Sequence, residues 1–319
     1  MASVMRAYSP DGYSVALPAY HRFPMHKYAM LRERVDASGV AQLCDPPAAS
    51  DEEILRAHSQ EYLAKLEAGG LTRKEEQALG LPWSPQLVLR ARYSAGSTLA
   101  ACRSAFTDGI AVSLAGGTHH AHRGRGEGYC VLNDGAIAAR AMQAEGRADR
   151  VLIVDCDVHQ GDGTAAILEG DDTVFTFSIH AASNYPFTKR ASDLDVALPD
   201  GALDPQYMEA LAPALDEALA RAQADLVIYL AGADPYAGDR LGKLSLSKKG
   251  LARRDRYVLQ ACRARGLPVA VTMGGGYAEP IEDTVDIYYH TVKAAAQSAA
   301  GRRSRDARCP GEALVKSAT

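Results

Sequence analysis

Residues 151–163 read VLIVDCDVHQGDG, and they are the most informative segment for the architecture of the chain. Four apolar residues that end abruptly in carboxylates and an imidazole are typical of a buried strand with polar groups at its carboxyl end. Residues two apart in an extended segment point to the same side, so we expect Asp157 and His159 to meet one ion while Cys156 and Val158 face elsewhere. A carboxylate and an imidazole in this arrangement suit zinc.

The composition is that of an ordinary globular protein. The 319 residues are 47% hydrophobic and 23% charged, enough for one large α/β domain. The formal net charge of -4, with no long basic run before 302–303, argues weakly against nucleic-acid binding. We find neither a signal peptide nor a long apolar span, and therefore expect a cytoplasmic protein that does not enter a membrane. The six cysteines include no CxxC pair, which predicts reduced thiols rather than disulfides or a thiolate zinc site.

Strand candidates alternate with helix candidates along the chain. Continuous apolar runs bounded by Gly, Pro or Asp predict strands at 110–115, 151–155, 174–179, 226–231 and 269–273. Apolar periodicity predicts helices near 85–107, 134–145, 205–222, 248–265 and 282–299. This alternation predicts a single-domain, three-layer α/β/α fold with a mostly parallel sheet. We expect the domain to span 1–299 and residues 300–319 to form a flexible C-terminal tail.

Chemically suggestive residues follow the carboxyl end of each predicted strand. They fall in the segments GGTHH (116–120), DCDVHQGD (155–162), SIH (178–180), AGAD (231–234) and GGGY (274–277). Each segment alone is compatible with a structural role, such as a surface pair of histidines, a helix cap or a turn. Because ligands of open parallel sheets bind beyond the carboxyl ends of the strands, the five segments together predict one functional site.

Four longer segments carry a resemblance to a known family. They are GGTHHAHRGRGEGYCVLND (116–134), VDCDVHQGDGT (154–164), AGADPYAGDRLGKLSLS (231–247) and GGGY (274–277). They resemble the histone deacetylase family of the arginase/deacetylase superfamily, over about residues 8–287. The segments YHRFPM (20–25) and GDRLG (238–242) look most like its class IV branch and the bacterial histone deacetylase-like amidohydrolases. The resemblance implies the arginase/deacetylase fold.

The resemblance also implies an activity, that of a zinc-dependent amidohydrolase. Such an enzyme would remove acyl groups, acetyl or longer, from the ε-amine of lysine in proteins or peptides. One Zn2+ per chain would be held by Asp157, His159 and Asp234, with open positions for water and the substrate carbonyl. Hydroxamates, which chelate zinc, would then be inhibitors.

Five further residues match the catalytic residues of the family. His120 would act as general base, and His119 would be the other member of the histidine pair. Asp162 would orient His120, and Asp155 would stand behind His119. Tyr277 would place its hydroxyl against the developing oxyanion, a contribution of about 3 kcal/mol if it behaves like other oxyanion donors.

The resemblance implies a structural potassium ion (K+) beneath the zinc. Its ligands would be main-chain oxygens of Asp155, Asp157 and His159 together with Ser178 and Ile179. For His180 we expect a packing role, and for the 119–126 stretch with His122 a solvated loop.

The substrate tunnel departs from the family pattern. Tyr129, which follows Gly128, stands where the family usually has a phenylalanine, and we expect Tyr185 on the opposite wall. Two tyrosines would still sandwich a lysine stem, while their hydroxyls add polarity at the mouth. Residues 81–85 read LPWSP, with no acid where many lysine deacetylases have a rim aspartate. This leaves room for small acylated amines, such as acetylpolyamines, as alternative substrates.

Two other interpretations predict different chemistry. An arginase-like enzyme with two manganese ions would need another bridging carboxylate, but Gly232 stands two residues before Asp234. A non-catalytic protein that keeps the metal for binding would need neither His120 nor Tyr277. The sequence therefore favours a hydrolase with one metal ion.

Overall fold

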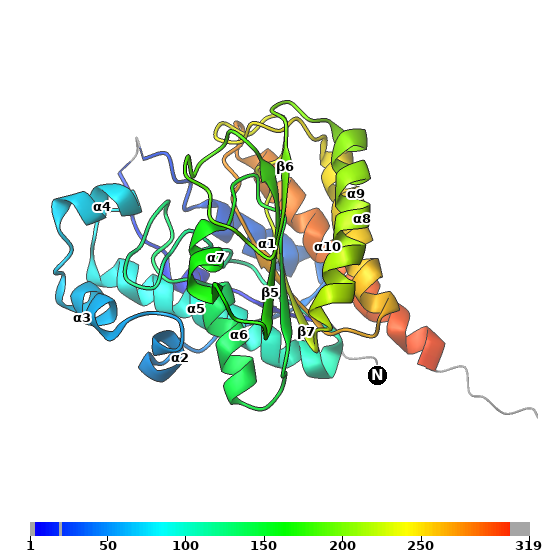
Figure 1. Cartoon of the computed structure of the whole chain (residues 1–319), viewed down its shortest axis with the longest axis horizontal. Helices are drawn as coiled ribbons and strands as arrows, with labels where there is room; N and C mark the ends of the chain where they lie inside the picture. The colour runs from blue at the N-terminus through cyan, green and yellow to red at the C-terminus, as the bar shows by residue number, and fades with distance from the viewer. Residues whose placement is uncertain (1–3, 19–20, 307–319) are drawn as a thin grey trace, which may run out of the picture.

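The computed structural model describes residues 4–18 and 21–306, which form an eight-stranded sheet between two layers of helices (Figure 1). The strand order is β2-β1-β3-β8-β7-β4-β5-β6, and every ladder is parallel. The strands are β1 (Arg6–Tyr8), β2 (Gln42–Cys44), β3 (Ile110–Ser113), β4 (Val151–Asp155), β5 (Val174–Ala181), β6 (Leu194–Leu198), β7 (Leu226–Ala231) and β8 (Val269–Met273).

Helices cover both faces of the sheet. On one face lie α1, α8, α9 and α10, and on the other lie α5, α6 and α7, with α2, α3 and α4 beyond them (Figure 1). Their bounds are η1 (Asp11–Tyr13), α1 (Lys27–Ser38), α2 (Asp51–Leu55), α3 (Gln60–Ala68), α4 (Arg73–Leu79), α5 (Pro85–Asp108), α6 (Asp134–Ala144), α7 (Asp162–Leu168), α8 (Asp204–Ala222), α9 (Lys248–Ala264) and α10 (Glu282–Asp306).

Strand β4 shows why its sequence is a continuous apolar run. Val151 and Ile153 belong to the core beneath α5 and α6, whereas Leu152 and Val154 belong to the core beneath α8, α9 and α10. Since both faces of a parallel sheet are covered, alternate residues are buried in different cores and no polar position is left. The predicted three-layer α/β/α fold is confirmed.

The structure also contains elements that the sequence did not predict. The three additional strands β1, β2 and β6 lie at or near the sheet edges, and β6 is only partly buried, so none of them is a long apolar run. Helix α10 continues to Asp306 instead of ending at 299. Residues 307–319, most of the expected tail, lie outside the described residues, so the domain boundary stays a prediction.

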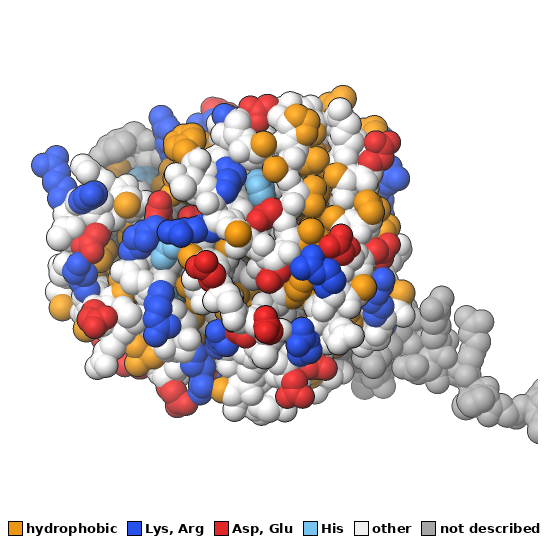
Figure 2. Space-filling view, viewed as in Figure 1, with side chains coloured by type: hydrophobic (Ala, Val, Ile, Leu, Met, Phe, Trp, Pro, Cys, Tyr) orange, Lys and Arg blue, Asp and Glu red, His pale blue; other side chains and the backbone are white. Residues whose placement is uncertain are grey.

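The surface carries mixed charge. Figure 2 shows acidic and basic side chains interspersed over this face of the molecule. Within the described residues, we find no helix with the length and apolarity that a membrane span requires.

Candidate active site

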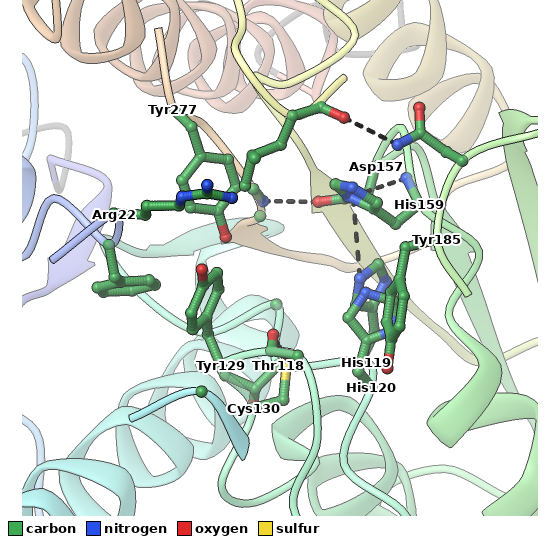
Figure 3. Close-up of a pocket in the computed structure, with 18 of the residues that line it drawn as sticks. Arg22, Thr118, His119, His120, Tyr129, Cys130, Asp157, His159, Tyr185 and Tyr277 are labelled. Carbon is green, nitrogen blue, oxygen red and sulfur yellow. Dashed lines mark hydrogen bonds and ion pairs between the residues drawn. The ribbon is translucent and has the colours of Figure 1, made fainter. Parts of the chain in front are cut away.

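Four neighbouring strands bring the predicted site residues together. In the order β3-β8-β7-β4, each strand is followed by one of the segments 116–120, 274–277, 231–234 and 155–162. Because all four strands are parallel, their carboxyl ends meet at one edge of the sheet. The segments 116–120, 155–162 and 274–277 line a cavity of about 540 Å³ at this edge (Figure 3), and Asp234 of the fourth segment lies beside it, against His159.

Asp157, His159 and Asp234 form a buried group that could hold a metal ion, with ligand atoms within 4.8 Å of one another. His159 Nδ1 lies 2.9 Å from Asp157 Oδ1 and 3.2 Å from Asp234 Oδ2. The explanation by strand alternation is wrong, because β4 ends at Asp155 and the chain bends after it. The backbone N–H of His159 donates to Asp157 Oδ1 at 2.9 Å, a turn contact that folds both side chains toward one point.

Burial and charge make this group suited to a cation. Burial opposes protonation of His159, but Asp157 and Asp234 outweigh it and raise the pKa of His159 to about 10. Burial and the neighbouring Asp157 raise the pKa of Asp234 to about 7. Asp234 Oδ2 is buried and accepts no well-aligned hydrogen bond, although it lies 3.2 Å from the imidazole nitrogen. Two buried carboxylates thus face one imidazole, and a metal ion would satisfy all three.

Backbone N–H groups hold one oxygen of each ligand carboxylate, Asp157 and Asp234. The N–H of Gly275 donates to Asp157 Oδ2 at 2.6 Å, and the N–H of Val158 donates to Asp234 Oδ1 at 2.9 Å. Residue 275 must be glycine, because a Cβ there would lie 1.8 Å from Asp234 Oδ2. The ligand carboxylates are therefore held in place by the protein itself, as metal ligands usually are.

Each histidine of the pair has its own carboxylate. His119 Nδ1 lies 2.6 Å from Asp155 Oδ2, and His120 Nδ1 lies 2.6 Å from Asp162 Oδ1 at the start of α7. Burial opposes the charged form of His119, but Asp155 and Asp157 raise its pKa to about 9. Burial and the neighbouring His119 lower the pKa of His120 to about 4. His120 is thus the neutral partner, able to accept a proton at neutral pH.

Tyr277 follows β8 and lies on another side of the cavity from the histidines (Figure 3). The backbone N–H of Tyr277 donates to Asp239 Oδ2 at 2.6 Å, and this hydrogen bond holds the backbone of the residue in place. Burial raises the pKa of Tyr277 well above its usual value, so its hydroxyl stays protonated and can donate a hydrogen bond. Asp239 lies in the loop between β7 and α9, within the segment 238–242, and the sequence predicted no role for it in the site.

The predicted tunnel residues Gly128, Tyr129 and Tyr185 all line the cavity, and Figure 3 shows the two tyrosines on either side of it. Gly128 has φ 55°, and a Cβ there would lie 2.7 Å from the ring of His120. The ring of Tyr185 stands edge-on to His120, with centroids 5.0 Å apart. Its hydroxyl donates to the carboxylate of Glu127, which sequence reasoning missed.

The expectation of a solvated loop at 119–126 is wrong for His122. This side chain is buried, and its Nε2 lies 3.1 Å from Asp162 Oδ2. The backbone of His122 pairs with Arg125 in a tight turn, which turns the imidazole inward and leaves Arg123 exposed. Asp162 therefore serves two histidines, His120 and His122.

The residues expected around potassium lie on two adjacent strand ends. Ser178 is opposite Asp155 in the ladder between β4 and β5, and both residues are buried, as are Asp157, His159 and Ile179. His180 is buried as well, with Nδ1 3.0 Å from Ser178 Oγ, which fits the expected packing role. Occupancy by K+ stays a prediction.

Comparisons with known proteins give one consistent result. A family model described as the histone deacetylase domain matches residues 21–293. An uncharacterized protein of Picosynechococcus is 46% identical over 288 residues, covering 89% of this chain and 95% of that protein. Histone deacetylase 2 of Arabidopsis thaliana is 28% identical, covering 89% and 78%. The acetoin utilization protein AcuC of Bacillus subtilis is also 28% identical, covering 85% and 76%. The crystal structure of the HDA15 HD domain matches with a TM-score of 0.78 at 23% identity, over 93% of this chain and 90% of that one, which shows the same fold.

Proposed function

Because the chain belongs to the histone deacetylase family, we propose that it is a zinc-dependent amidohydrolase that removes acyl groups from the ε-amine of lysine in proteins or peptides. One observation carries the proposal. Two carboxylate-paired histidines, a buried tyrosine and the potential metal ligands Asp157 and His159 line a single cavity, and the third potential ligand, Asp234, is buried against Asp157 and His159. These are the groups that metal-assisted hydrolysis of an amide requires.

The donor set supports one zinc ion held by Asp157, His159 and Asp234. When bound, zinc would polarise the acyl carbonyl and lower the pKa of a water molecule. A second metal would need another carboxylate, but a Cβ at Gly232 would lie 2.7 Å from Asp157 Cα and 2.9 Å from Asp234 Oδ1. The absence of room at this position favours the deacetylase type of site over the arginase type.

His120 would accept the proton of the attacking water. Its low pKa leaves the imidazole neutral, and Asp162 at Nδ1 fixes the ring so that Nε2 is the accepting atom. His119, between Asp155 and Asp157, favours the protonated state and would supply positive charge beside the reacting carbonyl. The Tyr277 hydroxyl would donate to the developing oxyanion from another side of the cavity.

The cavity mouth favours peptides over acylated polyamines. Tyr129 and Tyr185 offer aromatic walls for an aliphatic lysine stem, and the exposed Phe187 stands at the same cavity. Arg22 and Lys243 also line it, and their charge would repel a polycationic amine. We keep small acylated amines as the second candidate, since residues 81–85 supply no acid to grip a peptide backbone.

Three finer assignments belong to the same proposal. We propose a structural K+ beside the ends of β4 and β5, kinship with the class IV branch, and a cytoplasmic location. The adjacency of Asp155 and Ser178 supports the first, and the segments 20–25 and 238–242 support the second. The lack of a membrane-spanning helix among the described residues is compatible with the third.

A substrate panel tests the proposal. Zinc-loaded protein should hydrolyse at least one lysine peptide that carries an acetyl, crotonyl, octanoyl or myristoyl group, and a hydroxamate should inhibit it. His120→Ala should abolish most turnover while zinc stays bound, whereas the exposed His290→Ala serves as matched control. Hydrolysis of acetylpolyamines alone would select the second candidate. Inactivity on every amide, or about two metal ions per chain, would overturn the proposal.

A further inference from the structure

Arg254 of α9 is the largest fully buried side chain among the described residues. It lies outside the set of residues that line the cavity, yet its Nη1 donates to two carbonyl oxygens, that of Cys156 at 3.1 Å and that of Gly232 at 2.7 Å. Cys156 directly precedes the candidate ligand Asp157, and Gly232 stands two residues before the candidate ligand Asp234. One nitrogen atom thus joins the two chain segments that carry the candidate carboxylate ligands.

This link begins where the pairing of the two strands ends. The ladder between β4 and β7 runs as far as Asp155 and Leu230, and the N–H of Cys156 still donates to the carbonyl oxygen of Leu230 at 3.0 Å. Beyond this point the two segments leave the sheet, and strand pairing no longer sets the distance between them. The hydrogen bonds of Arg254 to Cys156 and Gly232 continue the connection across the gap.

The guanidinium group of Arg254 is itself held in one orientation. Asp255 Oδ1 lies 2.9 Å from Nε and 2.8 Å from Nη2 of Arg254. Asp255 in turn accepts hydrogen bonds from the hydroxyls of Tyr229 on β7 and Thr291 on α10, both at 2.6 Å. All four side chains are buried, so Nη1 is directed at the two carbonyls by contacts with three elements of the fold.

Stability alone does not account for a buried ion pair in this place. Replacement of such a pair by apolar side chains of similar volume is often neutral or stabilising, because the desolvation cost of both charges is avoided. An apolar side chain could not donate to two carbonyl oxygens at once, whereas the rigid fork of donors on a guanidinium can serve several acceptors. The feature that requires arginine is therefore the simultaneous contact with both ligand segments.

We propose that Arg254 is a positioning residue for the metal site, which sets the separation between the segments of Asp157 and Asp234 from outside the cavity. The inference rests on the proposed metal-dependent function. Metal sites tolerate deviations of only about 0.2 Å in ligand distances, so a small change in this separation should weaken binding of the ion. Arg254 acts through the backbone and does not contact the ion.

A paired substitution, Arg254→Met with Asp255→Asn, tests this role. It removes the donor to both carbonyls and leaves no unpaired charge in the core. Zinc affinity, measured by competition with a chromophoric chelator well below the melting temperature, should fall by about 10- to 100-fold, the range for groups that orient metal ligands. The absorption spectrum of bound Co2+, which reports the geometry around the ion, should change as well.

Leu259→Ala, at another fully buried position of α9, is the matched control for a loss of stability. Its melting temperature should fall because a cavity is created in the core, but the folded protein should keep zinc affinity within about threefold of the wild type. Its Co2+ spectrum should stay that of the wild type. Zinc affinity within about threefold of wild type in the paired variant, or an equal loss in Leu259→Ala, would overturn the role of Arg254.

Arg254→Lys is the second variant, judged by the same criteria if the paired variant does not fold. One ammonium group cannot contact both carbonyls and Asp255 as the guanidinium does. Failure of both variants to fold would assign Arg254 a purely structural role and overturn the inference. The zinc measurements need no substrate, so a wild type that binds zinc but cleaves no acyl substrate would overturn the proposed hydrolysis and not the role of Arg254.

Discussion

Gly275→Ala tests whether metal binding depends on the space that Gly275 leaves for the carboxylate of Asp234. The added Cβ would lie 1.8 Å from Asp234 Oδ2, against 3.4 Å for ordinary contact, so the carboxylate would have to move by about 1.6 Å. Metal sites tolerate deviations of only about 0.2 Å in ligand distances. Gly275 does not have a positive φ, so alanine brings no backbone strain of its own. The added Cβ would also lie 2.8 Å from Asp157 Oδ2, so the substitution should act on the two ligand carboxylates, and most strongly on Asp234.

The expected result is a loss of zinc affinity of at least about 100-fold, the upper range for disturbing a group that orients a ligand. This corresponds to about 2.8 kcal/mol. Competition with a chromophoric chelator measures the affinity, and zinc should raise the melting temperature of the wild type much more than that of the variant. Gly12→Ala is the control, since a Cβ there meets no atom within 4 Å. Zinc affinity within about threefold of wild type in Gly275→Ala would refute the assignment of Asp234 as a ligand.

Three other perturbations test the rest of the site. Asp162→Asn keeps the size of the side chain but removes the charge that fixes His120, so kcat should fall by about 100-fold or more with zinc content unchanged; a loss confined to KM would contradict this role. Tyr185→Ala should lower kcat/KM by about tenfold more than Tyr185→Phe, because only alanine removes the ring beside His120; equal losses would mean that the hydroxyl bond to Glu127 matters more than the wall. Zinc affinity should rise between about pH 6 and pH 8, because the raised pKa of His159, about 10, keeps a proton on the metal-free protein that zinc must displace. Calorimetry in buffers of different ionisation enthalpy should then find at least about one proton released per zinc, and release of none would refute this.

The sequence predicted the parts of the fold that depend on strong local patterns. The strands β3, β4, β5, β7 and β8 are long apolar runs because they are buried on both faces, and the polar residues that follow them meet at one edge. Because Asp157, His159 and Asp234 follow the carboxyl ends of predicted parallel strands, the sequence was enough to place them at the same edge of the sheet. Their roles in catalysis remain a proposal.

The supporting residues could not be predicted in the same way. Arg254 lies within a helix, Asp239 and Glu127 lie in loops, and each reaches the site only through the tertiary fold. His122 was placed wrongly because a tight turn, rather than polarity, decides which way its side chain points. The bend after Asp155 was missed for the same reason, since it depends on a side-chain contact to the backbone of His159.

The site can form only after the two middle strands of the sheet, β7 and β8, have paired. Strand β4 is separated from β3 by β7 and β8, which are the last strands in the chain. A fragment that ends before residue 226 lacks both middle strands, so the histidine pair and the ligands after β4 would have no common sheet to join them. Such non-local pairing forms late, because distant segments must first be brought together. Turnover in this protein should therefore report the fully folded chain, and separately expressed halves should regain it only when the C-terminal piece inserts both strands into the middle of the sheet.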